Sequence, residues 1–227
     1  EWELPLAHLK PLAEHCHARG IQFSCTPFYL EAVEELAPYV DFYKVASYEL
    51  LVMPLLEACA HSGKPVVLST GMATIEEIKH AASTLRHAGA HDITLLHCVS
   101  AYPTPASEAN LSAIKSIREA TGCKTGWSDH TRRPAVIERA VHHWNAAVVE
   151  FHLDLDGEGA EYASGHCWLP EEIAPVIARI HESLFADGTG FKGPQPSEIA
   201  DREWRADPSD GMRPLLHIRS SYKPEAA

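Results

Sequence analysis

Two stretches, Lys124-Thr-Gly-Trp-Ser-Asp-His-Thr131 and Ala147-Val-Val-Glu-Phe-His-Leu-Asp154, decide the fold. Each opens with a strand-like run and reaches a histidine where that run ends, His130 in the first and His152 in the second. Consecutive strands joined through a helix lie side by side and parallel, so both imidazoles are expected at the same end of one sheet. This placement predicts a metal site.

A purely structural role for either ring is the alternative, because the chain has 15 histidines and imidazole is also a common hydrogen-bonding core group. Polar neighbours favour the metal site. Ser128 and Asp129 precede His130, and Glu150 precedes His152, and such groups orient metal-bound rings through hydrogen bonds. His97, by contrast, is expected to be a hydrogen-bonded core residue.

The composition is that of one large globular domain, with 227 residues of which 45% are hydrophobic. A formal charge of −12 argues against general binding to nucleic acid or membrane, although local cations could hold a small anionic substrate. No apolar stretch has the ~18–20 residues that cross a bilayer, and no signal peptide is evident. Six singly spaced cysteines predict reduced thiols and a cytoplasmic location.

Six strand-like runs alternate with segments of helical periodicity. Polar residues follow nearly every run, which favours a TIM (β/α)₈ barrel over an open doubly wound sheet. We therefore predict an α/β fold of the TIM-barrel type that lacks the first two strands, with a smaller six-stranded fold as the alternative. The barrel is expected over residues 1–186, and a loop and tail over residues 187–227. The strands are expected at 21–25, 42–46, 65–69, 93–98, 124–127 and 147–152.

The helical periodicity has matching start and stop signals. Thr74 and Glu77 form a capping-box pattern, and Thr26-Pro27 and Leu169-Pro170 place proline in a first helical turn. Pro11 is expected to split the opening segment, so that a regular helix begins only there. Helices are expected near 11–19, 75–85, 111–117, 137–144 and 173–184.

The side chains that follow the strands predict the functional site, because in a barrel they line the C-terminal mouth. Lys44 is flanked by strand-core residues and should point into the mouth or at a carboxylate, since burying it unpaired is costly. Thr26 is equally well explained as a helix cap. Hydroxyls, a lysine and a glycine turn suit a phosphate or carboxylate ligand. The candidates are Thr26, Lys44, Ser47, Glu49, Ser69, Ser100, Tyr102, Ser128, His130, Glu150 and His152.

Five ordered motifs resemble those of the N-acetylneuraminate (sialic acid) synthase family, which includes N-acylneuraminate-9-phosphate, legionaminate and pseudaminate synthases. The resemblance covers about residues 1 to 200. The motifs are Tyr43-Lys-Val-Ala-Ser-Tyr-Glu49, Gly63-Lys-Pro-Val-Val-Leu-Ser-Thr-Gly-Met72, Leu95-Leu-His-Cys-Val-Ser-Ala-Tyr-Pro103, Trp127-Ser-Asp-His-Thr131 and Val149-Glu-Phe-His152.

The resemblance implies a TIM barrel that condenses phosphoenolpyruvate with an N-acylated aldose such as N-acetylmannosamine. The products would be a sialic-acid-type 2-keto sugar acid and phosphate, formed with help from Mn²⁺ or Mg²⁺, and the assembly would be a homodimer. By matching position, His130 and His152 would hold the metal and act in catalysis with Lys44 and Glu49. Phosphoenolpyruvate would contact Thr26, Lys44, Ser47, Ser69, Ser128 and Lys192, and the sugar would contact Glu49, Ser100, Tyr102 and Glu161.

The chain also departs from the family pattern. The family's first strand, with a catalytic glutamate, and its second strand, with a further lysine, have no counterpart before Glu1. Phe151 stands where a basic residue is usual, and the long loop 157–168 carries Glu161 where an aspartate is expected. Ser100 replaces a longer polar residue, and no antifreeze-like domain follows the barrel.

Two alternative functions remain open at this point. Lys44 could be the Schiff-base nucleophile of an aldolase, since a lysine on a barrel strand can be activated by burial. The chain could also be a non-catalytic, sugar-phosphate-binding relative.

Overall fold

The computed structural model describes residues 4–221. The chain divides into two compact units, Glu1–Ser183 and Leu184–Ala227, which are described separately.

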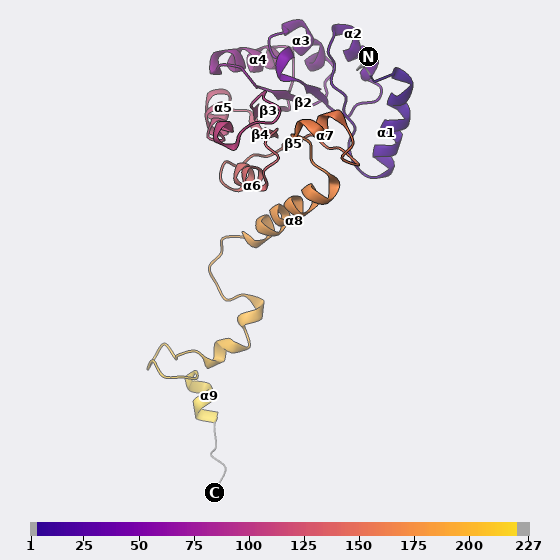
Figure 1. Cartoon of the computed structure of the whole chain (residues 1–227). Helices are drawn as coiled ribbons and strands as arrows, with labels where there is room; N and C mark the ends of the chain where they lie inside the picture. The colour runs from indigo at the N-terminus through magenta and orange to yellow at the C-terminus, as the bar shows by residue number, and fades with distance from the viewer. Residues whose placement is uncertain (1–3, 222–227) are drawn as a thin grey trace. The chain divides into compact units, whose positions relative to one another are not determined.

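The first unit is built on one parallel sheet that curls into a half-barrel (Figure 1). Its strands follow one another in chain order, as expected for strands joined by helical crossovers. Of the six strands expected from the sequence, five are formed within residues 4–221. They are β1 (Tyr43–Val45), β2 (Val66–Ser69), β3 (Ile93–Cys98), β4 (Lys124–Asp129) and β5 (Val149–Phe151).

The prediction of a strand at residues 21–25 was wrong. This segment runs alongside β1 without forming a ladder of hydrogen bonds with it. The backbone N–H of Asp41 donates to Phe23 O at 2.8 Å, and the Asp41 carboxylate accepts a bond from the Phe23 N–H. No described strand pairs with the other edge of this segment, and Ile21 is 58% exposed. A run with one backbone hydrogen bond to its neighbour lacks the paired donors and acceptors that define a strand.

Helices cover the convex face of the sheet, and α2 to α6 follow one another around it (Figure 1). Short 3₁₀ turns lie at Leu6–His8, Ser47–Glu49 and Ala106–Glu108. The helices of this unit are α1 (Leu9–Ala18), α2 (Leu30–Leu36), α3 (Met53–His61), α4 (Ile75–His87), α5 (Ala113–Thr121), α6 (Pro134–His142) and α7 (Ala160–Ser164), with α8 (Pro170–Ala186) running on into the second unit.

Most start and stop signals are confirmed. The Thr74 hydroxyl accepts a bond from the Glu77 N–H at 3.3 Å, and the Glu77 carboxylate accepts one from the Thr74 N–H at 2.7 Å. Gly122 ends α5 with a φ of 68°, where a side chain would be strained. Pro11 lies in the first turn of α1, where backbone N–H groups need no partner, so the helix begins two residues before it.

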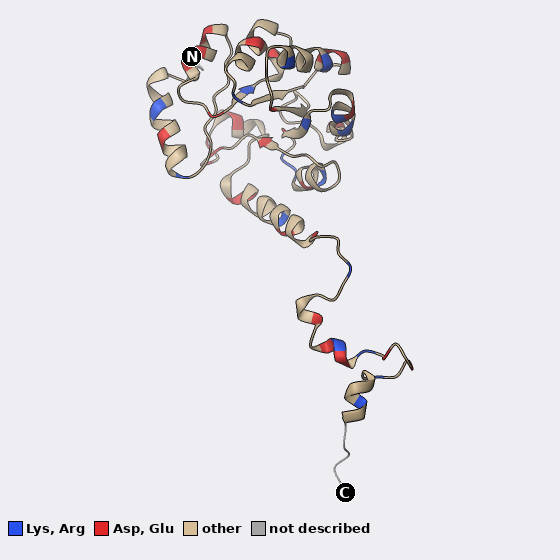
Figure 2. Ribbon diagram, turned by 180° about the vertical axis from the view of Figure 1, so that it is seen from behind, with Lys and Arg blue, Asp and Glu red and all other residues tan. Residues whose placement is uncertain are grey.

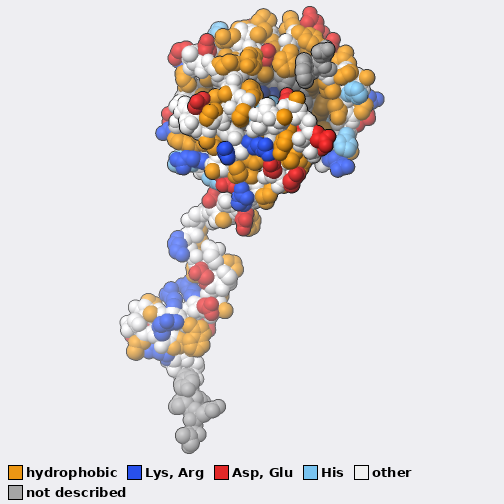
Figure 3. All heavy atoms as spheres, in the orientation of Figure 1, with side chains coloured by type: hydrophobic (Ala, Val, Ile, Leu, Met, Phe, Trp, Pro, Cys, Tyr) orange, Lys and Arg blue, Asp and Glu red, His pale blue; other side chains and the backbone are white. Residues whose placement is uncertain are grey.

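The helix start predicted from Thr26-Pro27 was wrong, because α2 begins only at Leu30. Tyr29, the residue before this helix, is extended, and the chain between Thr26 and Tyr29 has no regular structure. Phe28 is 65% exposed, and hydrophobic side chains are prominent on the face of the first unit drawn in Figure 3.

Two apolar clusters hold the helices on the sheet. One lies under α2, α3 and α4 against β1 to β3, and its fully buried members include Tyr43, Leu56 and Leu68. The other surrounds Trp127 on β4 and Trp168, which precedes α8. Positions of basic and of acidic residues both occur along the helices of this unit (Figure 2).

Close backbone packing fixes the last pair of strands. A Cβ at Gly126 on β4 would lie 2.3 Å from Val148 O, at the entry to β5. Only glycine allows this approach, which aligns Ser128 with Glu150 across the two strands.

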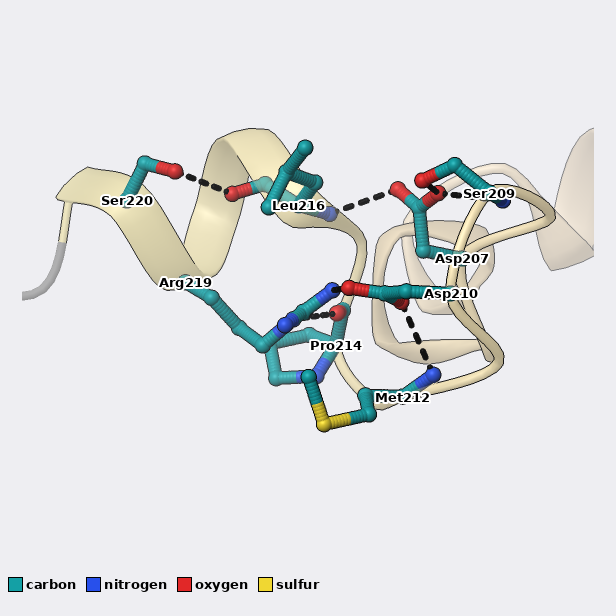
Figure 4. A network of polar contacts seen from close by, with 8 residues as sticks. All are labelled: Asp207, Ser209, Asp210, Met212, Pro214, Leu216, Arg219 and Ser220. Atoms are coloured by element: carbon teal, nitrogen blue, oxygen red, sulfur yellow. Dashed lines mark hydrogen bonds and ion pairs between the residues drawn. The ribbon is translucent and has the colours of Figure 1, made fainter.

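The second unit, expected to be loop and tail, contains two 3₁₀ turns, Pro196–Glu198 and Asp201–Trp204, and the helix α9 (Leu216–Ser221). A polar network holds the start of α9 (Figure 4). The Asp207 carboxylate accepts bonds from the N–H groups of Ser209 and Leu216, and its hydrogen bonds lower the pKa of this carboxyl to about 2. Arg219 donates to Asp210 and to Pro214 O.

None of the helices within residues 4–221 combines the length and the apolar character that spanning a bilayer requires.

Candidate active site

A cavity of about 350 Å³ opens at the carboxyl ends of the strands of the half-barrel. Its wall contains nine of the thirteen side chains that the sequence singled out as site residues. The active sites of barrel enzymes lie at this end of the sheet. The lining residues are Thr26, Lys44, Ala46, Ser47, Tyr48, Ser69, Cys98, Tyr102, Ser128, His130, Glu150, Phe151 and His152.

The Glu150 carboxylate lies at the centre of the polar contacts in this cavity. Lys44 Nζ is 3.2 Å from Glu150 Oε1, and the hydroxyls of Ser128 and Ser69 donate to Oε2 at 2.7 and 3.4 Å. These groups come from four different strands, so the sheet itself sets their spacing. The ammonium and the two hydroxyls are all donors, and in this structure the Glu150 carboxylate accepts from them.

Lys44 meets the carboxylate partner expected for a strand lysine. Its side chain is 15% exposed and also donates to Val45 O at 3.3 Å. The sequence analysis placed Glu150 at the mouth of the barrel and beside His152 as an orienting group, and it did not identify this carboxylate as the partner of Lys44. The β4–β5 register, which pairs Ser128 with Glu150, was the signal that could have found it.

The turn after β2 closes one side of the cavity. The Gly71 N–H donates to Ser47 Oγ at 3.0 Å, and the same hydroxyl lies 3.2 Å from Cys98 Sγ. A Cβ at Gly71 would lie 2.3 Å from Ser100 Oγ and 2.9 Å from both other groups. Glycine is required here because three side chains crowd its Cα.

The two predicted metal histidines lie close together. The ring centroids of His130 and His152 are 5.2 Å apart, and Tyr102 stacks 4.2 Å from His130. A metal about 2 Å from each ring nitrogen lies roughly 3 Å from each centroid, so two rings that share it stand roughly 4.5–5.5 Å apart. The spacing of these two rings therefore fits one shared divalent cation.

The state of the rings also fits a cation, because metal ions bind neutral imidazole. Burial lowers the pKa of His130, His152 and His166 below the ordinary value for histidine. His130 Nδ1 lies 2.8 Å from Val99 O and donates to it when that nitrogen is protonated, which leaves Nε2 as the free donor atom.

The loop after β5 brings further metal-binding side chains to His152. A parallel bridge joins Leu153 to Trp168, and the Trp168 N–H donates to His152 O at 2.8 Å. The loop therefore returns to its starting point and places His166 and Cys167 beside His152. The sequence analysis noted the length of this loop and missed both residues. The adjacent His-Cys pair was the available signal.

Asp129 is a structural group rather than a ligand. It is fully buried, and its two oxygens accept bonds from the indole N–H groups of Trp127 and Trp168. The backbone N–H groups of Thr131 and Arg132 also donate to it. This carboxylate fixes the turn that carries His130. His97 is likewise structural, as predicted, with Nε2 3.0 Å from Ala109 O.

Four predicted site residues lie outside the cavity wall. Glu49 Oε2 and Ser100 Oγ are buried without a hydrogen-bond partner, and burial raises the pKa of Glu49. Glu161 lies on α7 with one oxygen 3.6 Å from His152 Nδ1. Lys192 belongs to the second unit, so its expected contact with phosphoenolpyruvate stays a prediction.

The fold and the cavity define the class of this chain: a parallel α/β protein with a curled half-barrel sheet, and with a lysine–carboxylate pair and a histidine cluster at the carboxyl ends of its strands. Residues 1–192 match the model of the NeuB family, and the chain belongs to this family.

Similar proteins carry named activities. The chain is 43% identical over 223 residues to pseudaminic acid synthase of Helicobacter pylori, which covers 98% of this chain and 64% of the relative. It is 36% identical over 199 residues to N,N'-diacetyllegionaminic acid synthase of Campylobacter jejuni, which covers 86% of this chain and 59% of the relative. The chain thus spans less than two thirds of the length of these curated relatives.

A solved structure extends the likeness to three dimensions. The crystal structure of N-acetylneuraminic acid (sialic acid) synthetase from Leptospira borgpetersenii in complex with citrate superposes with a TM-score of 0.77 at 31% identity. The match covers 92% of this chain and 73% of that chain.

Proposed function

We propose that the protein condenses phosphoenolpyruvate with an N-acylated aldose and releases a sialic-acid-type 2-keto sugar acid and phosphate. The observation that carries this proposal is the convergence of Lys44, Ser69 and Ser128 next to the histidine pair in one cavity of a NeuB-family chain. One edge of the cavity suits an anion, and the other suits a cation and a carbonyl oxygen.

Phosphoenolpyruvate fits the anion-binding edge by its charge. Lys44 Nζ has three N–H donors, of which Glu150 and Val45 O take two, so one remains for a substrate oxygen. The hydroxyls of Ser47, Ser69 and Ser128 can turn toward a phosphate or carboxylate. Thr26 and Lys192 are the further phosphoenolpyruvate contacts that we propose.

We assign the sugar to the side of the cavity that Tyr102 lines. Ser100 and Glu49 lie outside the cavity wall, each with a buried polar atom that has no partner, and their contact with the sugar is proposed from the family resemblance. Glu161 is the further sugar contact expected from the family. The identity of the N-acyl group is left to the substrate assay.

The histidines suit a divalent cation by their spacing and by their neutral state. When bound, the cation polarises the aldehyde carbonyl and makes it electrophilic. His130 and His152 would hold it, while Lys44 and the serine hydroxyls stabilise the negative charge of the departing phosphate. The Tyr102 ring lies 4.2 Å from the His130 ring and would help to fix its orientation.

The test is release of phosphate from phosphoenolpyruvate, measured with N-acetylmannosamine, its 6-phosphate and 2,4-diacetamido sugars, with and without Mn²⁺. Release that requires both substrates and the cation is expected. The His152→Asn variant should lose on the order of 10²-fold in kcat/KM, because His152 is one of the two rings that would hold the ion. Equal release by this variant and by the wild type would contradict the metal role.

The aldolase alternative is disfavoured by the ion pair of Lys44 with Glu150. A Schiff-base nucleophile needs an amine free to attack a carbonyl, whereas Lys44 Nζ lies 3.2 Å from Glu150 Oε1 in an ion pair. Borohydride treatment with pyruvate should leave no covalent adduct on Lys44. A non-catalytic sugar-phosphate-binding protein would show ligand binding by calorimetry and no phosphate release.

The remaining expectations from the sequence stay predictions. They concern a homodimer, a cytoplasmic location supported by six free cysteines, and a catalytic unit over residues 1–186.

A further inference from the structure

A second set of metal-binding side chains lies next to the expected histidine pair. His152, Glu161, His166 and Cys167 each offer one donor atom, and these four atoms lie within 4.8 Å of one another. His166 and Cys167 are 5% and 2% exposed, whereas Glu161 is exposed. In a tetrahedral zinc site the donors stand roughly 3.3–3.8 Å apart, so side-chain movements of about 1 Å bring this set to binding distance.

The ring positions show which histidines can share an ion with the thiol. The centroids of His152 and His166 are 4.7 Å apart, within the range for two rings on one metal. Those of His130 and His166 are 6.5 Å apart, which two rings reach only on opposite sides of the ion. His152 can therefore share an ion with either His130 or His166. Only the pair with His166 also has a thiol, Cys167, and a carboxylate, Glu161, within the same group of donor atoms.

The loop that carries these ligands is fixed by the backbone. Asp154 N donates to Trp168 O at 2.9 Å and Trp168 N donates to His152 O at 2.8 Å, so Cys167 is held next to β5. Ser164 Oγ lies 2.7 Å from His166 Nδ1, which leaves Nε2 as the donor atom for a cation. Such supporting hydrogen bonds are typical of metal-bound histidines.

We propose that His152, Glu161, His166 and Cys167 bind one divalent cation of the zinc type. A thiolate ligand selects Zn²⁺ or Co²⁺ over Mg²⁺ and Mn²⁺, which prefer oxygen ligands. This set would bind its ion through a sulfur atom. It shares His152 with the proposed pair of His130 and His152, so one chain would hold one of the two ions at a time. The inference rests on the proposed function only for the role of the ion, since binding is measured without substrates.

The test is a titration of the metal-free full chain with Co²⁺, followed by optical absorption. One Co²⁺ per chain is expected, with the strong visible bands of tetrahedral cobalt and a near-ultraviolet band from sulfur-to-cobalt charge transfer. Co²⁺ binding without the charge-transfer band overturns the inference, and this outcome needs no variant.

Variants assign the band to its ligand. Cys167→Ser should remove the charge-transfer band and weaken Co²⁺ binding at least 10-fold, whereas Cys16→Ser on α1 should leave both unchanged. Glu161→Gln changes an exposed side chain that the fold does not need, and it should weaken binding several-fold. A band that survives in Cys167→Ser overturns the inference. The inference is also overturned if the His130→Ala protein loses Co²⁺ binding while the Cys167→Ser and His166→Gln proteins bind Co²⁺ fully.

The outcomes also separate the site from the activity. A sulfur-to-cobalt band in a protein that releases no phosphate with any N-acyl aldose supports the metal site and contradicts the proposed function. Phosphate release by a protein whose cobalt spectrum lacks this band contradicts the metal site and supports the function.

Discussion

Single residues decide the chemistry of the cavity, and Glu150 matters most because it joins Lys44 to Ser69 and Ser128. The sequence could predict that Lys44 needed a carboxylate, because a buried ammonium without a partner is costly. It could not predict which carboxylate, since Lys44 on β1 and Glu150 on β5 meet only because the sheet curls. His166 and Cys167 were missed for the same reason, because a loop closure sets their position.

Replacing Glu150 tests its place at the centre of these contacts. Glu150→Gln keeps an oxygen that accepts from Ser128 and removes the charge that pairs with Lys44. We expect a loss of about 1–2 kcal/mol in the free energy of unfolding, because the pair is only partly buried. We also expect a fall in kcat/KM on the order of 10²-fold as Lys44 shifts.

Urea unfolding and the phosphate-release assay measure the two effects. Glu57→Gln on the exposed face of α3 is the matched control and should change neither. A Glu150→Gln protein that is as stable and as active as the wild type would show that the ion pair is incidental.

His97 should make folding sensitive to acid. Burial lowers its pKa below 6.5, so the unfolded chain takes up a proton before the folded chain does. Its contribution to stability is complete above about pH 6.5 and decreases as the pH falls below that value. His97→Gln can keep the bond to Ala109 O and removes this titration.

Urea unfolding between pH 7 and 5 tests this expectation. The variant should lose stability less steeply than the wild type, by up to about 1.4 kcal/mol per pH unit, the effect of one proton. The same slope in both proteins would mean that the folded state accommodates the protonated ring.

At the scale of elements, the sequence predicted helices better than strands. The cap of α4 depends on residues three apart, Thr74 and Glu77, so local sequence specifies it. The segment 21–25 has the apolar residues of a strand, but a strand also needs a paired neighbour, which a local pattern does not contain. The helix start predicted at Thr26-Pro27 was wrong because Tyr29 is extended, and α2 therefore begins at Leu30.

The α4 cap is a test of stability that leaves the cavity untouched. Thr74→Ala removes the hydroxyl that accepts from the Glu77 N–H and should cost about 1 kcal/mol in the free energy of unfolding. Glu76→Gln in the same turn, which loses only an exposed pair with Lys79, should cost about half of that or less. Phosphate release should be unchanged in both. Equal stability of the Thr74→Ala and wild-type proteins would contradict the capping role.

At the scale of the whole molecule, the first unit is a curled sheet of five parallel strands, and its concave face opens into a hollow of about 700 Å³. The βα alternation and the polar residues after each strand were enough to predict the barrel-type architecture and most of the cavity wall. Closure of a barrel is a property of the complete sheet, so the pattern within this chain could not establish it. The family match supports a synthase, and the cavity indicates where its substrates would bind.

The most direct test of the central claim, that the carboxyl ends of these strands form the phosphoenolpyruvate site, is calorimetric titration of this ligand. The wild type and a Ser69→Ala, Ser128→Ala double variant should bind one molecule per chain, with Kd at least 10-fold higher in the variant. Loss of two hydrogen bonds to a charged ligand predicts this difference. Equal affinity in both proteins would show that phosphoenolpyruvate binds elsewhere and would contradict the account.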